Sequence, residues 1–455
     1  MNSQLPAAAQ FVIIGGGAIG CGAAFAMARA GLSDILLLER AEDVGQTTTA
    51  QGAGLCGQVR DSVERIKLAM HSVATFRQLQ MEEPGTNSKL QGPSFRETPN
   101  CKEDSRLGMG ASLPRPDWHE VGSLRIALSE SRAEEFRRLK KTADEAGLET
   151  ALIDVSEAKR RWPLMNFLKV KAVLWCASDG YLTPGCLVKA YQHQSRKAGV
   201  QFATSVAVEE IVCGNGRVKA VKTNCGAVEC ACVINAAGAH AYHVARLVGL
   251  DLPIVPVRHE YFVTVPLEGL TPDLPCFRIP EMTLYGRVRD HGLLLGGWET
   301  SSLHADPRTY ALSGTPPQIN PDWQVLNSFA DRMGQLFPGL NGAEAKCVAK
   351  GWPTFTPDGR FIIGESCRVK GFVMAGGCNA HGISGSAGIG RLLVAALTPA
   401  LSRPSERRGG MGEGENRVPP AYLKSLSPDR FTENHWVWDA ACQQAQAVYE
   451  TYYGV

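Results

Sequence analysis

The sequence predicts an α/β fold with two interleaved domains, and three observations lead to this prediction. Residues 11–39 run from a short apolar segment through a glycine-rich turn and a helical segment to a second apolar segment, the order of a β-α-β unit. Residues 371–397 repeat the strand, the glycine-rich turn and the helix. Between them, residues 253–266 and 281–299 read as alternating strands, which are typical of a mixed or antiparallel sheet.

The first β-α-β unit opens with FVII at residues 11–14, a β-branched apolar run suited to a strand that is buried on both faces. Gly15, Gly17 and Gly20 follow with the spacing G-x-G-x-x-G. In this pattern the first glycine permits the tight turn, the second lets backbone N–H groups approach a pyrophosphate, and the third lets the helix pack closely on the strand. Five glycines interrupt the apolar run, and no basic residue precedes it, so a membrane span or an export signal is not expected.

The rest of the unit supports the same interpretation. We expect a helix over residues 18–30 that ends at Gly31, a common residue at helix C-termini. A second strand over residues 35–38 then ends at Glu39, where a carboxylate would bind a ribose hydroxyl. The unit therefore predicts a bound dinucleotide, with a purely structural β-α-β unit as the alternative.

Composition excludes several classes of protein. The 455 residues carry a formal net charge of +2, which gives no reason to expect nucleic acid or a membrane surface as a partner. The 14 cysteines are scattered, and Cys230 and Cys232 lie on an expected strand, where packing is favoured over metal ligation. Without an export signal, this cysteine usage favours a reducing compartment, and we expect a cytoplasmic protein.

The middle of the chain supplies further elements. Residues 122–129 read as an alternating strand, residues 131–147 as an amphipathic helix, and residues 179–199 as a turn followed by a helix with Pro184 in its first position. Residues 200–240 read as strands joined by the turn GNGR and closing on NAAGAH, which would return the chain to the cofactor. The expected division is a cofactor domain at 1–80, 150–245 and 345–400, a substrate domain at 118–149 and 246–344, surface insertions at 83–117 and 403–420, and a C-terminal helical segment at 421–455.

The second glycine-rich turn bears on the identity of the cofactor. Its helix begins near Ser386, so two helix N-termini would be aimed at one long cofactor. A nicotinamide dinucleotide can use a single unit of this kind. A flavin gains from a second helix N-terminus, because reduction places negative charge near its N1 and O2 edge. The sequence therefore favours a flavin.

The motifs taken together resemble a known group. In order along the chain they are GSLRIA, DGYLTPG, NAAGAH, PVRHEYFVT, GWPTFTPD and GGCNAHGISGSAGIG. This order resembles that of the flavin-dependent amine oxidoreductases of the D-amino acid oxidase superfamily, and above all the flavoprotein part of dimethylglycine and sarcosine dehydrogenases. The resemblance implies a D-amino acid oxidase-like fold that binds FAD. It also implies oxidation of a carbon–nitrogen bond by hydride transfer to flavin N5, followed by hydrolysis of the imine.

The resemblance also implies which residues hold FAD. These are Gly15, Gly17, Ala18, Ile19, Gly20, Glu39, Arg40, Thr48, Thr49, Gln51, Gly52, Ala53, Gly54, Leu55, Val208, Ala237, Gly238, Gly351, Asn379, His381, Gly382, Ile383 and Ser384.

Candidate catalytic and substrate-binding residues lie on the expected strands. His259, in RHEY, matches the histidine that lines the substrate site of dimethylglycine-oxidising relatives, and Tyr285 lies near their active-site tyrosine. A histidine bonded to a backbone carbonyl and a tyrosine that closes a sheet edge are the structural alternatives. Arg60 and Arg287 are candidates for binding a substrate carboxylate, with surface ion pairs as the alternative. His381 could face the flavin or cap the second helix.

Two departures from the family concern attachment of FAD. The dehydrogenases bond FAD covalently through a histidine, and the matching run TTAQGAGL has Gln51 there. Monomeric sarcosine oxidases use a cysteine, whose nearest counterpart is Gly351. Neither residue can form the bond, so we expect non-covalent FAD. Two further departures concern other parts of the family pattern. The arginine that D-amino acid and glycine oxidases place before the same motif would fall at Pro353, and the folate-binding region of the mammalian-type dehydrogenases is not expected in the sequence up to Val455.

Three functional hypotheses follow. The first is an enzyme that oxidises a secondary or tertiary amine, such as an N-methylated amino acid, with oxygen or an electron-transfer partner as acceptor. The second is the flavoprotein subunit of a larger amine or opine dehydrogenase, which would have partner subunits. The third is a catalytically idle regulatory relative, against which the glycine motif, Glu39 and His259 together argue.

Overall fold

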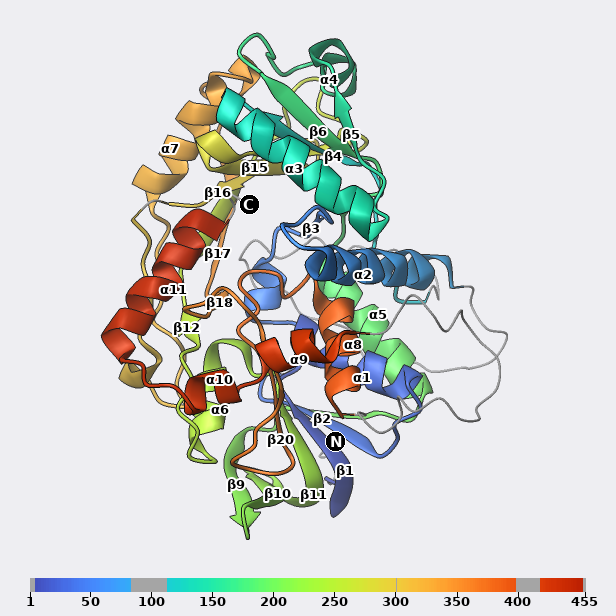
Figure 1. Ribbon diagram of the computed structural model, residues 1–455, viewed down its shortest axis with the longest axis vertical. Helices are drawn as coiled ribbons and strands as arrows, with labels where there is room; N and C mark the ends of the chain where they lie inside the picture. The colour runs from blue at the N-terminus through green and yellow to red at the C-terminus, as the bar shows by residue number, and fades with distance from the viewer. Residues whose placement is uncertain (1–4, 83–112, 300, 398–417, 453–455) are drawn as a thin grey trace.

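The computed structural model describes residues 5–82, 113–299, 301–397 and 418–452, and two large sheets organise them (Figure 1). The helices are α1 (Ala18–Arg29), α2 (Val63–Met81), α3 (Glu130–Ala146), α4 (Val155–Arg161), α5 (Pro184–Lys197), α6 (Ala241–Arg246), α7 (Trp323–Gly334), α8 (Ser386–Leu397), α9 (Pro420–Leu426), α10 (Asp429–Thr432) and α11 (Trp438–Tyr452).

The strands fall into two eight-stranded sheets and two short pairs. The first sheet contains β1 (Ala8–Ile14), β2 (Ile35–Glu39), β8 (Gln201–Thr204), β9 (Val208–Gly214), β10 (Arg217–Thr223), β11 (Gly226–Asn235), β19 (Ile362–Glu365) and β20 (Phe372–Gly376). The second contains β4 (Ser123–Ala127), β5 (Ala151–Ile153), β6 (Ala172–Cys176), β13 (His259–Thr264), β14 (Cys276–Ile279), β15 (Leu284–Arg289), β16 (Gly292–Gly297) and β17 (Ala345–Gly351). The short pairs are β3 (Leu55–Cys56) with β7 (Gly180–Tyr181) and β12 (Val255–Pro256) with β18 (Thr354–Phe355).

The first sheet confirms the predicted β-α-β unit. Strands β20, β11, β1, β2 and β8 run side by side and are parallel, with Ile13 of β1 opposite Leu37 of β2 and Ile234 of β11. All four residues from 11 to 14 are buried, as expected for a strand covered on both faces. The central strands therefore deliver the glycine turns to one edge of the sheet.

Different layers cover the two faces of the first sheet. Helices α1, α5 and α8 pack together on one face (Figure 1). The other face packs against the β9–β10 hairpin and α6. The two residues of the hairpin turn, Asn215 and Gly216, have φ angles of 52° and 69°. The commonest two-residue hairpin turn requires positive φ at both positions, so the predicted GNGR turn is confirmed.

The second sheet has the order β17-β13-β16-β15-β14-β4-β6-β5 and is antiparallel except where β14 meets β4. One face packs on α7 and α4 through a core that contains Leu284, Leu295, Phe329 and Trp162. Every residue of β16 is buried, so the expected alternation is wrong for this strand. The reason is that α7 covers one face of the strand and the other faces the cofactor domain.

The sheets divide the chain somewhat differently from the expected domains. Strands β5, β6 and β17 come from segments that we placed in the cofactor domain, yet they pair in the second sheet. The C-terminal segment is helical, as expected, in α9 to α11. Most of both expected insertions lies outside the described residues.

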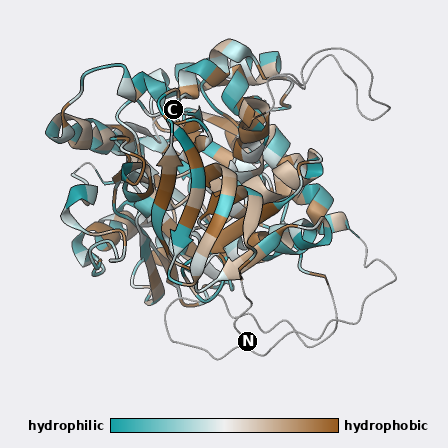
Figure 2. Cartoon of the chain, turned by 90° about the horizontal axis from the view of Figure 1, so that it is seen from below, coloured by the Kyte–Doolittle hydropathy of each residue, from teal (hydrophilic) through white to brown (hydrophobic). Residues whose placement is uncertain are grey.

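Hydropathy follows this arrangement. Figure 2 shows hydrophobic residues concentrated on the central strands and hydrophilic residues on the outer faces of the helices. Among the described residues, no helix combines the length and the apolar character that crossing a membrane requires.

Candidate functional site

The first glycine loop is shaped by close backbone contacts. Gly15 has φ +109°, and a Cβ atom there would lie 2.5 Å from the Ala236 carbonyl oxygen. A Cβ atom on Gly20 would lie only 1.8 Å from the Gly15 carbonyl oxygen. Gly17 is the N-cap of α1 and, as a glycine, supplies no side-chain hydrogen bond to the first N–H groups of the helix. Such an N-terminus is a binding site for a phosphate.

The residues around this loop define its surroundings. The Glu39 carboxylate accepts hydrogen bonds from the Gly16 N–H (2.6 Å) and the Ala41 N–H (2.8 Å). The Ala18 N–H donates to Thr49 Oγ1 (3.1 Å), which brings the short helix Thr48–Gln51 against the N-terminus of α1.

Some predicted cofactor residues have other roles in the packing. The Arg40 guanidinium donates to the carbonyl oxygens of Leu312 (3.3 Å) and Gly314 (3.0 Å), so it holds the 312–314 segment. Val208 begins β9 and packs in the core that lies on the hairpin side of the first sheet. Gly238 follows Ala237 with φ +55° at the turn after β11.

The second glycine loop meets the first. A Cβ atom on Gly382 would lie 3.9 Å from Ile19, and one on Gly22 would lie 2.9 Å from the Ser386 carbonyl oxygen. Asn379 accepts from the Thr356 N–H (3.0 Å) and donates to the Gly377 carbonyl oxygen (2.9 Å). The segments 15–20 and 379–386 therefore form one continuous cradle, as the two expected helix N-termini require.

The segment after Thr49 closes this cradle. A Cβ atom on Gly52 would lie 2.1 Å from Cδ1 of Ile383, and one on Gly54 would lie 2.0 Å from the Leu182 carbonyl oxygen. A Cβ atom on Gly351 would lie 2.5 Å from Oε1 of Gln51. Gln51 and Gly351 are the positions that match the residues through which the family's dehydrogenases and monomeric sarcosine oxidases bond FAD. These two positions are thus neighbours in the structure, although they are 300 residues apart in the sequence.

One face of the second sheet turns toward this segment. Tyr261 and Tyr285 both lie opposite Gly296, and with Ala349 they form a small core that contacts Ala53 and Leu55. The Tyr261 hydroxyl donates to the Gly52 carbonyl oxygen (3.3 Å). This face belongs to the strands that were expected at residues 253–266 and 281–299.

His259 lies on the same face, at the end of β13 opposite Gly351. Its Nε2 is 2.7 Å from the Tyr285 hydroxyl and its Nδ1 is 3.2 Å from the Tyr449 hydroxyl. Burial lowers the pKa of His259 to about 4, so the imidazole is neutral at pH 7. Both ring nitrogens contact tyrosine hydroxyls, so this histidine is not simply bonded to a backbone carbonyl.

Arg287 is buried rather than part of a surface ion pair. Its Nε donates to the Ala53 carbonyl oxygen (2.9 Å), and its guanidinium lies 4.3 Å from the centre of the Tyr181 ring. Burial lowers the pKa of Arg287 from its ordinary value. A cation held in this way beside the 52–55 segment could bind an anionic group.

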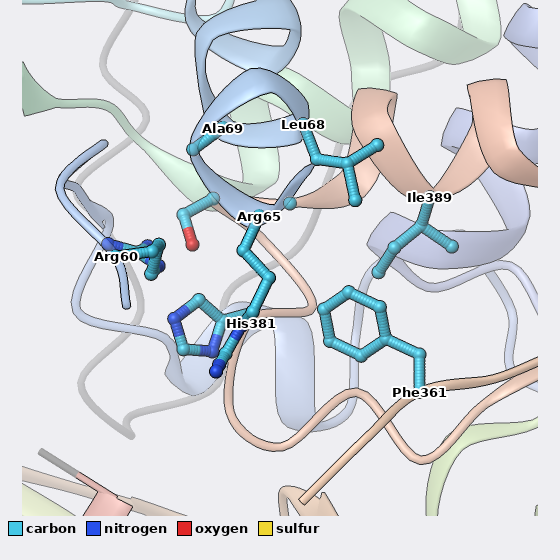
Figure 3. A pocket seen from close by; sticks show the side chains of 9 residues that line it. Arg60, Arg65, Leu68, Ala69, Phe361, His381 and Ile389 are labelled. Carbon is cyan, nitrogen blue, oxygen red and sulfur yellow. The ribbon is translucent and has the colours of Figure 1, made fainter. Parts of the chain in front are cut away.

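Arg60 and His381 meet in a pocket between α2 and the second glycine loop (Figure 3). Arg65, Phe361 and Ser384 also line this pocket. Arg60 is buried and donates to the Val59 carbonyl oxygen (2.7 Å). Burial, together with the guanidinium groups of Arg60 and Arg65, holds the pKa of His381 well below its usual range.

Sequence reasoning missed two residues near the site. Tyr449 lies on the expected terminal helix, but nothing in the sequence of that helix indicates which face reaches His259. Arg125, in GSLRIA, is buried and donates to the same Val59 carbonyl oxygen as Arg60 (2.7 Å). A charged residue inside an otherwise apolar strand was the available signal for Arg125.

The opposite face of β13 carries a buried ionic cluster. Arg258 pairs with Glu299 (2.5 Å) and Asp322 (2.9 Å), and Glu260 Oε2 accepts from the Asp322 N–H (3.2 Å). Glu260 is 1% exposed, and its Oε1 has no hydrogen-bond partner among the described residues. Burial is the main reason that the pKa of Glu260 is raised to about 7.

This cluster predicts a pH-dependent stability. The unfolded carboxyl titrates near 4.5 and the folded one near 7, so the unfolded chain releases its proton first as pH rises. As pH rises from 4.5 to 7, the unfolding free energy of wild type should fall by up to about 3 kcal/mol more than that of Glu260→Gln, which has no carboxyl to titrate at this position. Denaturant unfolding of both proteins across this pH range measures the difference. Glu268→Gln, at an exposed position, is measured in parallel as a control for the loss of a carboxylate outside the cluster, and a difference for Glu260→Gln that is constant with pH would contradict the prediction.

Among the described residues, no three His, Cys, Asp or Glu side chains gather as ligands of a metal ion would. Cys230 and Cys232 pack in different core clusters, on the two sides of the first sheet. The interpretation of these cysteines as packing residues is confirmed.

The fold and the site together define a class of protein that has two glycine-rich loops at helix N-termini, as dinucleotide-binding folds do, and a second sheet whose face contacts the 52–55 segment. The family model of FAD dependent oxidoreductases (DAO) matches residues 10–396, and the chain belongs to this family. The geometry fits FAD, because two helix N-termini in glycine-rich loops form one cradle, with Glu39 at the end of β2.

Named proteins support the family membership. The chain is 28% identical over 402 residues to the mitochondrial sarcosine dehydrogenase of Mus musculus, covering 86% of this chain and 40% of the relative. It is 26% identical over 442 residues to 4-methylaminobutanoate oxidase (formaldehyde-forming) of Paenarthrobacter nicotinovorans, covering 96% of this chain and 50% of the relative. The chain thus spans at most half the length of these two relatives. The solved L-proline dehydrogenase of P. horikoshii shares the fold, with a TM-score of 0.76 at 20% identity over 94% of this chain and 99% of that chain.

Proposed function

We propose that this protein oxidises a secondary or tertiary amine, namely an N-methylated amino acid of the sarcosine or dimethylglycine type. The observation that carries the proposal is the His259–Tyr285 pair, which lies on the sheet face that contacts the 52–55 segment of the cofactor cradle. The names of the relatives, which include a sarcosine dehydrogenase and a methylaminobutanoate oxidase, support the same class of substrate.

The residues of this site divide the work between binding and proton handling. FAD supplies the acceptor for a hydride from the carbon next to nitrogen. His259, which is neutral at pH 7 and hydrogen-bonded to Tyr285, adds no positive charge beside the amine. The reactive form of the amine is the neutral one, because a protonated ammonium has no lone pair to assist loss of that hydride. Arg287 and Arg60 are the candidates for binding the substrate carboxylate, which fixes the position of the reacting carbon. The oxidised C–N bond is then hydrolysed by water, which releases formaldehyde and the demethylated amine.

Turnover with defined products tests this proposal. Purified protein loaded with FAD is incubated with sarcosine, dimethylglycine or 4-methylaminobutanoate, with oxygen or an artificial electron acceptor. At least one amine should give formaldehyde and the demethylated amine in equal amounts. Turnover that requires the artificial acceptor would identify an electron-transfer partner as the natural acceptor. Formaldehyde from none of the amines with either acceptor would overturn the proposal.

The Gln51–Gly351 contact predicts that FAD is held without a covalent bond. A carboxamide and a glycine have no nucleophilic nitrogen or thiol to bond the flavin. After acid precipitation of the holoprotein, we expect the flavin in the supernatant. Denatured protein mixed with free FAD controls for physical trapping, and a pellet that stays yellow beyond this control would show that the attachment is covalent.

A further inference from the structure

Tyr449 brings the C-terminal helix into the candidate site. It is 1% exposed, and its ring packs edge-on against Phe355 with 5.4 Å between the ring centres. Its neighbours on α11, Cys442 and Ala445, are buried in the same core as Val257. The hydroxyl of Tyr449 is therefore held at a fixed place beside His259.

Hydrogen bonds within α11 and its surroundings make this placement firm. The Glu450 carboxylate accepts from the backbone N–H of Ser302 (2.9 Å) and from its hydroxyl (3.0 Å). Trp438, at the start of the helix, donates its indole N–H to Asp251 (3.2 Å). The helix is thus anchored near both ends, and Tyr449 lies on its buried side.

The two contacts of His259 differ in length, and this difference selects a tautomer. A neutral imidazole has one N–H donor and one nitrogen acceptor. Bonds donated by hydroxyl groups are characteristically shorter than bonds donated by N–H groups. The 2.7 Å contact at Nε2 therefore fits a hydroxyl proton donated by Tyr285, and the 3.2 Å contact at Nδ1 fits an N–H donated to the Tyr449 oxygen.

We propose that Tyr449 is a positioning residue that accepts the Nδ1–H of His259 and thereby keeps Nε2 free of a proton, as the acceptor for the Tyr285 hydroxyl. This proposal rests on the proposed function for its chemical consequence. With the Tyr285 O–H donated to Nε2 of His259, that proton is directed away from the substrate amine, whose lone pair is then left to assist loss of the hydride.

The tautomer can be read without any substrate. Long-range proton–nitrogen NMR spectra of FAD-loaded protein, labelled with nitrogen-15 only in histidine, distinguish protonated from unprotonated ring nitrogens. The His259 signals are assigned by their loss in His259→Gln. We expect Nδ1 protonated in wild type, and a substantial population with Nε2 protonated in Tyr449→Phe, because phenylalanine lacks the hydroxyl oxygen to which Nδ1–H donates. Wild type with Nε2 protonated, or a Tyr449→Phe spectrum with the wild-type tautomer, would overturn the proposal.

A matched control separates positioning from support of the helix. Tyr242 packs edge-on against Trp438 of the same helix at 5.0 Å, so Tyr242→Phe removes a tyrosine hydroxyl at α11 away from His259. It should leave the His259 tautomer and the limiting rate of flavin reduction as in wild type. Tyr449→Phe should retain FAD and lower that limiting rate about tenfold, with amine affinity nearly unchanged. If no amine reduces the flavin while the tautomer shifts as expected, the proposed function fails and the role of Tyr449 stands.

Discussion

Replacement of Gly20 by alanine should strongly weaken the binding of FAD. The added Cβ atom would lie 1.8 Å from the Gly15 carbonyl oxygen, and the obstacle is backbone rather than a flexible side chain. Helix α1 must then move away from β1, which displaces the N–H groups that would bind the pyrophosphate. We expect FAD affinity to fall at least about 100-fold, or about 2.7 kcal/mol, as measured by flavin fluorescence on dilution.

A control at the other end of the same helix isolates the cause. Gly31 has φ +82°, but no atom lies within 4 Å of a Cβ atom placed there. Gly31→Ala should cost about 1 kcal/mol of stability through backbone strain, with FAD affinity preserved. Equal FAD affinity in Gly20→Ala and wild type would show that this loop does not bind the dinucleotide.

Replacement of His259 by glutamine should slow reduction of the flavin by amine about 100-fold or more, the usual contribution of a positioned acid–base group. Glutamine keeps a polar side chain of similar length but lacks the basic nitrogen that faces the Tyr285 hydroxyl (2.7 Å). Anaerobic stopped-flow measurements give the limiting rate and the amine dissociation constant separately. The limiting rate should carry most of the loss.

The exposed His435 offers the corresponding control, because it lies on the surface between α10 and α11. His435→Gln should reduce at the wild-type rate. A His259→Gln protein that also matches wild type would remove His259 from the chemistry and leave it as a structural histidine of β13.

The local parts of this fold could be predicted from the sequence. Strand β1, the glycine turn and α1 are encoded by residues within a stretch of about thirty, so their spacing specifies the unit directly. The same holds for Pro184 at the first position of α5 and for the GNGR turn. The strands that carry His259 and Tyr285 were also recognised, because both lie in runs rich in β-branched and aromatic residues.

Contacts between distant segments could not be predicted in the same way. Tyr449 is 190 residues from His259, and the meeting of Gln51 with Gly351 spans 300. The ionic cluster of Arg258, Glu260 and Glu299 depends on the packing of α7 against the second sheet. A sequence pattern records which residues are apolar or charged, whereas these contacts depend on how two domains pack. The roles of the individual site residues stay predictions that the variants above test.

The measurement that tests the account most directly is the visible spectrum of the FAD-loaded protein during anaerobic addition of sarcosine and dimethylglycine. Without oxygen or another acceptor, electrons taken from the amine remain on the flavin, so the yellow colour of oxidised flavin reports the reaction itself. We expect at least one of these amines to bleach the flavin at a rate that saturates with amine concentration. A flavin that dithionite bleaches and neither amine changes would contradict the account.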